Sequence, residues 1–159
     1  MSTGADNHHW VRLAGSAAAD GWEVALTDGI EGGLHTGLLV GTLTPGESRV
    51  VELGSREGIV VPLSGGDVSL HCLRDGVEGS ATLAGRESVW AGAADTAYLP
   101  PGSTHTLTGA GDGPVRVAIC LATDEIGTQP PPFHHRRAAD VPVELRGAGI
   151  ASRQVRNFG

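Results

Sequence analysis

Short runs of apolar and β-branched residues recur along this chain, and each run has the length of one β-strand. Several runs alternate between large aliphatic residues and smaller or polar ones, which places the aliphatic side chains on one face of a strand. The range 115–122 is the clearest case, with Val115, Val117, Ile119 and Leu121 on one face. The pattern predicts strands over 22–27, 34–43, 49–53, 59–63, 68–73, 87–90, 96–99, 105–108 and 115–122. So many short strands at close spacing are typical of an all-β sandwich or barrel.

The segments between these strands have the composition of tight turns. Glycine with proline, aspartate, serine or arginine fills the ranges 44–47, 64–67, 74–76 and 109–114. Glycine reaches positive φ and proline fixes φ, so we expect hairpin turns at these places. The proline-rich range 128–137 cannot continue a central strand, because proline has no N–H to donate. We therefore expect a barrel that ends near Ala122, followed by an irregular arm.

Composition supports one domain with two flanking segments. The 159 residues include 25 glycines and 9 prolines but only 4% aromatic residues, which suits short strands joined by turns. We divide the chain into a polar N-terminal segment (1–18), a β-barrel (19–124) and a C-terminal arm (125–159). The net charge of −7 argues against a nucleic-acid partner, because such proteins present a positive surface to phosphates.

The chain shows no sign of a membrane or secretion segment. Residues 1–10 are polar, and no apolar run reaches the roughly 20 residues that a membrane-spanning helix needs. We therefore expect a cytoplasmic protein with no membrane partner. Cys72 and Cys120 lie in alternating apolar runs, where buried reduced thiols are the ordinary expectation. A disulfide between the two cysteines is the alternative.

The most specific local pattern is Pro-Pro-Gly-Ser-Thr-His at residues 100–105. Pro100 fixes the backbone at the end of a predicted strand and Gly102 supplies the turn, so the next strand begins with His105 pointing inward. This pattern resembles the second motif of cupin proteins, PxGxxH, whose histidine is a metal ligand in metal-binding cupins.

The first cupin motif offers two histidines two residues apart and a glutamate. In the corresponding stretch here, Glu52 and Gly54 stand at the two histidine positions, and Glu57 remains as the carboxylate. Glu57 and His105 are then what is left of a four-ligand set, whereas a tight divalent site has at least three protein ligands. We therefore expect no metal in this chain. His71 is either a surface residue or an additional interior ligand.

Arg86 and Tyr98 are further candidates for a binding site. An arginine near a barrel mouth binds a carboxylate through two parallel hydrogen bonds, which would suit a sugar acid. The alternative for Arg86 and for Arg56 is a surface ion pair. We predict a pocket lined by Arg86, Tyr98 and His105 that binds a sugar acid or another small molecule, and we assign no catalytic residue.

An ordered set of segments resembles a known family. The segments are 19–22, 57–65, 83–90, 98–100 and 146–157, and the most specific is Arg-Gly-Ala-Gly followed by Arg153, Val155 and Asn157. Together they resemble the first half of the two-cupin isomerases of the 5-deoxyglucuronate isomerase family, which acts in myo-inositol catabolism. Related ketol-isomerases of deoxy-hexosulose-uronates belong to the same family.

The resemblance implies a cupin jelly-roll barrel and, for the whole enzyme, the isomerisation of an aldose to a ketose. In that family the metal lies in the second cupin, and residues matching 125–159 bridge the two cupins. The resemblance therefore implies a half that is not catalytic alone, has no cofactor of its own, and packs against a second cupin or another copy. Two alternatives remain: a stand-alone cupin that binds a sugar or small molecule without metal, and a metal enzyme that uses Glu57, His105 and His71.

Overall fold

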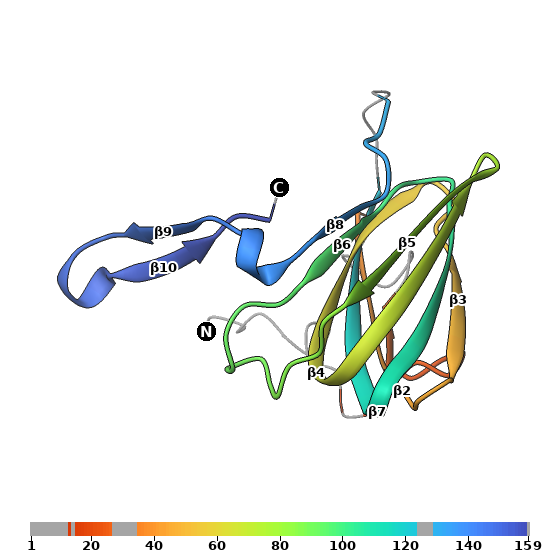
Figure 1. Cartoon of the computed structure of the whole chain (residues 1–159), viewed down its shortest axis with the longest axis horizontal. Coiled ribbons are helices and arrows are strands. Elements are labelled where there is room, and N and C mark those ends of the chain that lie inside the picture. Colours follow the sequence, from red (N-terminus) through yellow and green to blue (C-terminus); the bar gives the residue numbers. More distant parts are fainter. Residues whose placement is uncertain (1–12, 14, 27–34, 124–128, 159) are drawn as a thin grey trace, which may run out of the picture.

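The computed structural model describes residues 13, 15–26, 35–123 and 129–158, which are nearly all β-structure (Figure 1). The strands are β1 (Val24–Leu26), β2 (Thr36–Leu43), β3 (Ser48–Glu52), β4 (Arg56–Arg74), β5 (Val77–Leu83), β6 (Thr96–Leu99), β7 (Thr104–Thr123), β8 (His134–Arg136), β9 (Val143–Arg146) and β10 (Arg153–Arg156). Short 3-10 turns, η2 (Ala138–Asp140) and η3 (Gly149–Ala151), lie near the C-terminus. No helix in the described ranges is long and apolar enough to cross a lipid bilayer. The polar segment expected over 1–18 lies largely outside these ranges.

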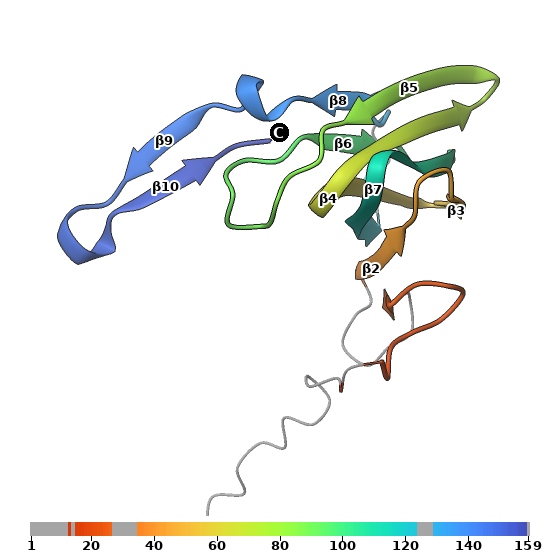
Figure 2. The ribbon, with the colours of Figure 1, turned by 60° about the horizontal axis from the view of Figure 1, so that its bottom comes forward.

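β4 and β7 are long strands, and each runs through two layers. The first half of β4 pairs with the second half of β7, between Arg56–Thr123 and Gly65–Val115. These halves form the first layer with β1, β2, β6 and β8, in the order β1-β2-β7-β4-β6-β8. The other two halves form the second layer with β3 and β5, which pair with β7 and β4 respectively. The predicted all-β architecture is therefore confirmed as a two-layer sandwich (Figures 1 and 2), although its hydrogen bonds do not close it into a barrel.

Glycines allow the long strands to pass between the layers. The ranges 64–67 and 109–114, which the sequence predicts as turns, lie inside β4 and β7, so that prediction was wrong. The pairing of the two strands shifts register twice near this point. Gly65 has a φ of +93° and lies so close to Pro114 that a Cβ would overlap the Pro114 carbonyl oxygen. Glycine permits the positive φ and the close backbone contact of this bend. A hairpin turn requires glycine for the same reasons, so the sequence does not distinguish the two.

The core lies between the two layers. It takes alternate residues from both: Leu39, Leu43, Val60, Leu99, Val115, Val117, Ile119 and Leu121 from the first layer, and Val51, Leu53, Val68, Leu70, Leu83 and Leu107 from the second. The predicted inner face of the 115–122 strand is therefore confirmed. Cys120 lies on the outer face and is exposed, which corrects the expectation that both cysteines are buried, and both Cys72 and Cys120 are free thiols.

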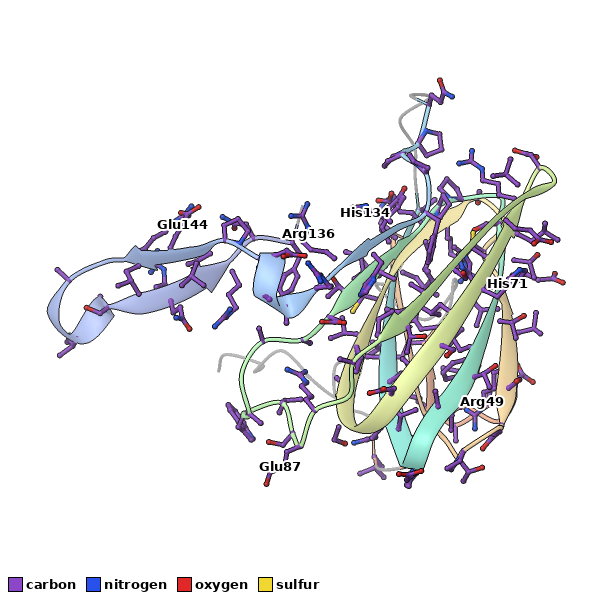
Figure 3. The ribbon with its side chains drawn as sticks, in the orientation of Figure 1. Arg49, His71, Glu87, His134, Arg136 and Glu144 are labelled. Carbon is purple, nitrogen blue, oxygen red and sulfur yellow. The ribbon has the colours of Figure 1, made fainter. Side chains whose placement is uncertain are left out.

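Two strand assignments need correction. The range 87–90 was predicted as a strand, but it lies in the loop between β5 and β6, where Trp90 is 91% exposed. Figure 3 shows Glu87 on this loop, away from the sandwich. β5 was not predicted, because its inner positions Gly79 and Ala81 are small and the residues between them are polar. These small residues leave room for Phe133, which lies against Gly79.

The C-terminal arm contains regular structure that the sequence did not predict. β8 pairs with β6, so the sandwich gains one strand after Ala122. Beyond η2, β9 and β10 form an antiparallel ribbon with Val143 opposite Arg156 and Arg146 opposite Arg153. Figures 1 and 2 both show this ribbon projecting away from the sandwich.

Candidate functional site

His105 lies inside the sandwich, near the end that carries the hairpin between β4 and β5. We call this end the mouth. The turn after β6 contains Gly102 at a φ of +73°, and β7 then starts at Thr104. The next residue, His105, points inward and is fully buried, as the sequence predicts. Its neighbours on the adjacent strands are Val51 and Cys72.

The hydrogen bonds of His105 define its tautomer. The His105 Nε2 lies 2.6 Å from Ser103 Oγ, and the Ser103 hydroxyl donates a hydrogen bond to the carbonyl oxygen of Pro100. Ser103 Oγ therefore accepts from His105 Nε2–H, which leaves a lone pair on Nδ1. This buried Nδ1 has no hydrogen-bond partner among the described residues. Burial, and to a lesser extent the charge of His71, lowers the pKa of His105 to about 4, so the ring is neutral at physiological pH.

Apart from Ser103 and the Cys72 thiol, the described side chains beside His105 are apolar. Val51 and Leu53 are the buried residues of the β3 end, whereas Glu52 is exposed. The buried positions of this stretch are therefore Val51 and Leu53, each one residue before Glu52 and Gly54, which the sequence motif placed at the histidine positions. Phe133 lies on the same side, with its ring centroid 6.1 Å from that of His105.

Glu57 and Tyr98 lie on the opposite face of the first layer. On β4, Glu57 precedes Gly58, whose α-carbon faces the core residues Leu121 and Ile119. On β6, Tyr98 stands between the core residues Ala97 and Leu99, so its side chain also points outward. The Tyr98 hydroxyl donates to Glu57 Oε2 at 2.8 Å, in a groove of about 160 Å³.

Glu57 and His105 thus point away from each other and do not form one site. No group of three or more histidine, cysteine, aspartate or glutamate side chains in the described ranges could hold a metal ion. Glu57 and His105, the two ligands that remain of the cupin motifs, therefore do not belong to one metal site.

Arg86 and His71 are also outside the interior. The Arg86 guanidinium donates to the carbonyl oxygens of Pro62 at 2.9 Å and Gly92 at 3.2 Å, which ties the β5–β6 loop to β4. His71 lies on the outer face of the second layer, where its Nε2 is 3.7 Å from Glu78 Oε2 (Figure 3). The structure does not bring Arg86, Tyr98 and His105 together, and a ligand role for each of them stays a prediction.

A pocket of about 540 Å³ opens at the mouth, between the β4–β5 hairpin and the proline-rich segment before β8. Its walls include Cys72, Gly79, Pro100, Pro132 and Phe133, and Arg74 lies at its rim. Sequence reasoning missed Arg74 and Phe133 as site residues. A signal was present for each, since Arg74 opens an Arg-Asp-Gly turn and Phe133 follows three prolines.

The two-layer jelly roll with an inward histidine after a proline–glycine turn is that of the cupin class. Comparison with known proteins agrees: the model of the KduI/IolB family matches residues 10–159. The chain therefore belongs to the KduI/IolB family, and the predicted family resemblance is confirmed. No match was found among curated proteins.

Two solved structures with TM-scores above 0.5 show the same fold. An IolB-like protein from Salmonella typhimurium LT2 is similar with a TM-score of 0.67 and 25% identity, over 88% of this chain and 50% of that one. Peruvianin-I, a cysteine peptidase from Thevetia peruviana latex, is similar with a TM-score of 0.56 and 16% identity, over 75% of each chain. An oxalate decarboxylase from Lactobacillus farciminis reaches a TM-score of 0.46 at 12% identity, over 58% of this chain and 25% of that one. This chain spans about half the length of the IolB-like protein.

Proposed function

We propose that this chain is the non-catalytic cupin half of an aldose–ketose isomerase that acts on a sugar acid, such as 5-deoxyglucuronate in cytoplasmic inositol catabolism. The family supports the reaction class, and the share of the IolB-like protein that the chain spans supports one cupin of two. The observation that carries the proposal is the apolar surrounding of His105, formed by Val51, Leu53 and Phe133.

The isomerisation needs two groups that this interior does not combine. A base must move a proton between adjacent carbons, and an electrophile must stabilise the negative oxygen that develops. His105 Nδ1 can accept a proton, but its cross-strand neighbours, Val51 and the neutral thiol of Cys72, offer no cation to stabilise an oxyanion. Glu57 is held by Tyr98 on the other face. A bound metal ion would supply the electrophile, but the described residues around His105 do not provide enough ligands to hold one.

Metal analysis tests this proposal. Protein dialysed after purification should contain well under one equivalent of Mn, Fe, Ni or Zn, because the described residues do not gather three or more ligands around His105. His105→Ala should leave the small metal content unchanged. A stoichiometric ion that disappears in both His105→Ala and Glu57→Ala would contradict the proposal.

We also propose that the β9–β10 ribbon docks on a second cupin domain, which another copy of this chain supplies when the chain is alone. A two-stranded ribbon without further packing is marginally stable in water. The ribbon nevertheless exposes 83% of Leu145, and Ile150 in η3 is fully exposed. Apolar side chains at such positions need a partner surface.

Sedimentation velocity checks this expectation. The wild-type chain should sediment as a dimer or larger species, and Leu145→Glu should shift it toward the monomer. Val50→Glu is the matched control, because Val50 is 62% exposed but lies on β3 in the sandwich. A wild-type chain that is strictly monomeric would refute the docking role of the ribbon.

A further inference from the structure

We propose that the pocket at the mouth binds a small carboxylate with a flat apolar body, and that Arg74 holds the carboxylate group. This binding role is separate from the isomerase chemistry and does not depend on a second cupin. At about 540 Å³ the pocket lies within the usual range of small-molecule sites, roughly 300 to 1,000 Å³. Its described walls come from three places: the β4–β5 hairpin, Pro100 after β6, and the segment 129–133.

The walls favour an apolar, planar ligand. Phe133, Pro132 and Pro100 present an aromatic ring and two pyrrolidine rings to the pocket, and these surfaces stack on flat groups. Gly79 has no side chain to fill the opposite side of the pocket, where a Cβ would lie 2.9 Å from Phe133 Cδ1. The position of Phe133 against β5 is thus set by the absence of a side chain at residue 79.

The charges at the rim favour an anion. Arg74, Asp75 and Glu78 all border the pocket, but their exposure differs. The Arg74 side chain is 27% exposed, whereas Asp75 is 88% exposed and Glu78 is 70% exposed. Water screens the two carboxylates more strongly, so the less exposed guanidinium acts on the pocket more strongly than either carboxylate does.

Arg74 has capacity for a ligand. Among the described residues its ionic contact is with Asp75, where Nε and Oδ2 are 3.7 Å apart, too far for a hydrogen bond. A guanidinium without a hydrogen bond to the described residues can offer its parallel N–H groups to a carboxylate, which gives both strength and orientation. The sequence predicts this role for Arg86, but the Arg86 guanidinium donates its hydrogen bonds to backbone carbonyls.

The floor of the pocket carries no negative charge to oppose an anion. Cys72 lies there, 3% exposed. Burial is the main cause that raises the pKa of the Cys72 thiol, so it stays neutral at physiological pH. His105, the cross-strand neighbour of Cys72, is neutral as well.

NMR titration of the full chain tests the proposal with three probes: benzoate, benzyl alcohol and glucuronate. Benzoate should shift the amide signals of Cys72, Gly79 and Phe133. Benzyl alcohol has the same ring without the charge, and glucuronate has the charge without the apolar body. Each should bind about tenfold more weakly than benzoate or worse, because the loss of hydrogen bonds to a charged group or of apolar contact has at least that effect.

Variants separate the role of Arg74 from a general charge effect. Arg74→Gln should weaken benzoate binding by about tenfold or more, and Arg74→Lys should fall between, since a lysine keeps the charge but not the paired N–H groups. Arg153→Gln is the control, because Arg153 is exposed on the ribbon, and it should bind benzoate as the wild type does. Equal binding of benzoate and benzyl alcohol, tighter binding of glucuronate, or an unchanged affinity in Arg74→Gln would each overturn the proposal. So would the absence of shifts at the pocket residues.

Discussion

Asp95→Ala is expected to destabilise the fold by about 2 to 4 kcal/mol, because it removes an acceptor shared by three parts of the chain. Asp95 is 8% exposed. Its Oδ1 accepts from the Ala138 backbone N–H at 2.8 Å, and its Oδ2 accepts from that of Ala84 at 3.0 Å and lies 3.1 Å from His135 Nε2. The carboxylate thus joins the end of β5, strand β8 and the 3-10 turn η2. Urea denaturation of both proteins measures the loss.

Asp140→Ala is the matched control for Asp95→Ala. Asp140 lies in η2 and pairs with Arg137, but both side chains are largely exposed, and such pairs contribute little. Its removal should leave the midpoint of unfolding unchanged. If Asp95→Ala were as stable as Asp140→Ala, the described junction would not hold the arm to the sandwich.

The contribution of Asp95 should also depend on pH. Burial by itself raises the pKa of Asp95, but the N–H groups of Ala138 and Ala84 together with His135 outweigh burial and lower it. A lowered folded pKa means that the carboxylate stabilises the fold above its unfolded pKa of about 3.9, and that this stabilisation is lost as the pH falls through the folded value. The stability difference between wild type and Asp95→Asn should therefore shrink below about pH 4. A constant difference at all pH values would show that charge plays no part.

Gly109→Ala should destabilise the sandwich by about 2 to 3 kcal/mol, since an added methyl group would force backbone movement. A Cβ at Gly109 would overlap the carbonyl oxygen of Thr44, and the turn at 44–47 is hydrogen-bonded to Gly109 through both its N–H and its C=O. Thermal and urea denaturation measure the effect. This glycine lies where β7 passes between the layers.

Gly113→Ala provides the control on the same strand. A Cβ at Gly113 meets nothing within 4 Å, and neither Gly109 nor Gly113 has a positive φ. Gly113→Ala should change the stability by no more than about 0.5 kcal/mol. Equal effects of the two substitutions would mean that backbone entropy, not the contact with Thr44, makes Gly109 necessary.

The fold was predictable wherever one face of a strand is apolar. The alternation at 115–122 gave the inner face of β7 correctly, because period two matches a half-buried strand. The same criterion gave the wrong result at 87–90, because the apolar pair Val89 and Trp90 has the pattern of a strand end but lies exposed in a loop. β5 was missed because Gly79 makes room for Phe133, a residue far away in the sequence.

The site was predictable only in part. Local chemistry sufficed for His105, because a proline–glycine turn fixes where the next strand begins and which face its second residue takes. The faces of Glu57 and Tyr98 depend on strand register, which a single sequence does not specify at the strand ends. The loop that carries Arg86 folds back on β4 through backbone carbonyls, for which the sequence has no signal.

Turnover of 5-deoxyglucuronate by the purified chain is the measurement that tests the central claim most directly. The conversion of aldose to ketose is followed by NMR, without metal and with added Mn, Fe or Zn. We predict no turnover under any of these conditions, because the described residues do not gather a metal site around His105 and Glu57 lies on the other face. Metal-dependent turnover that either Glu57→Ala or His105→Ala abolishes would contradict it, and would show that this cupin has an active site of its own.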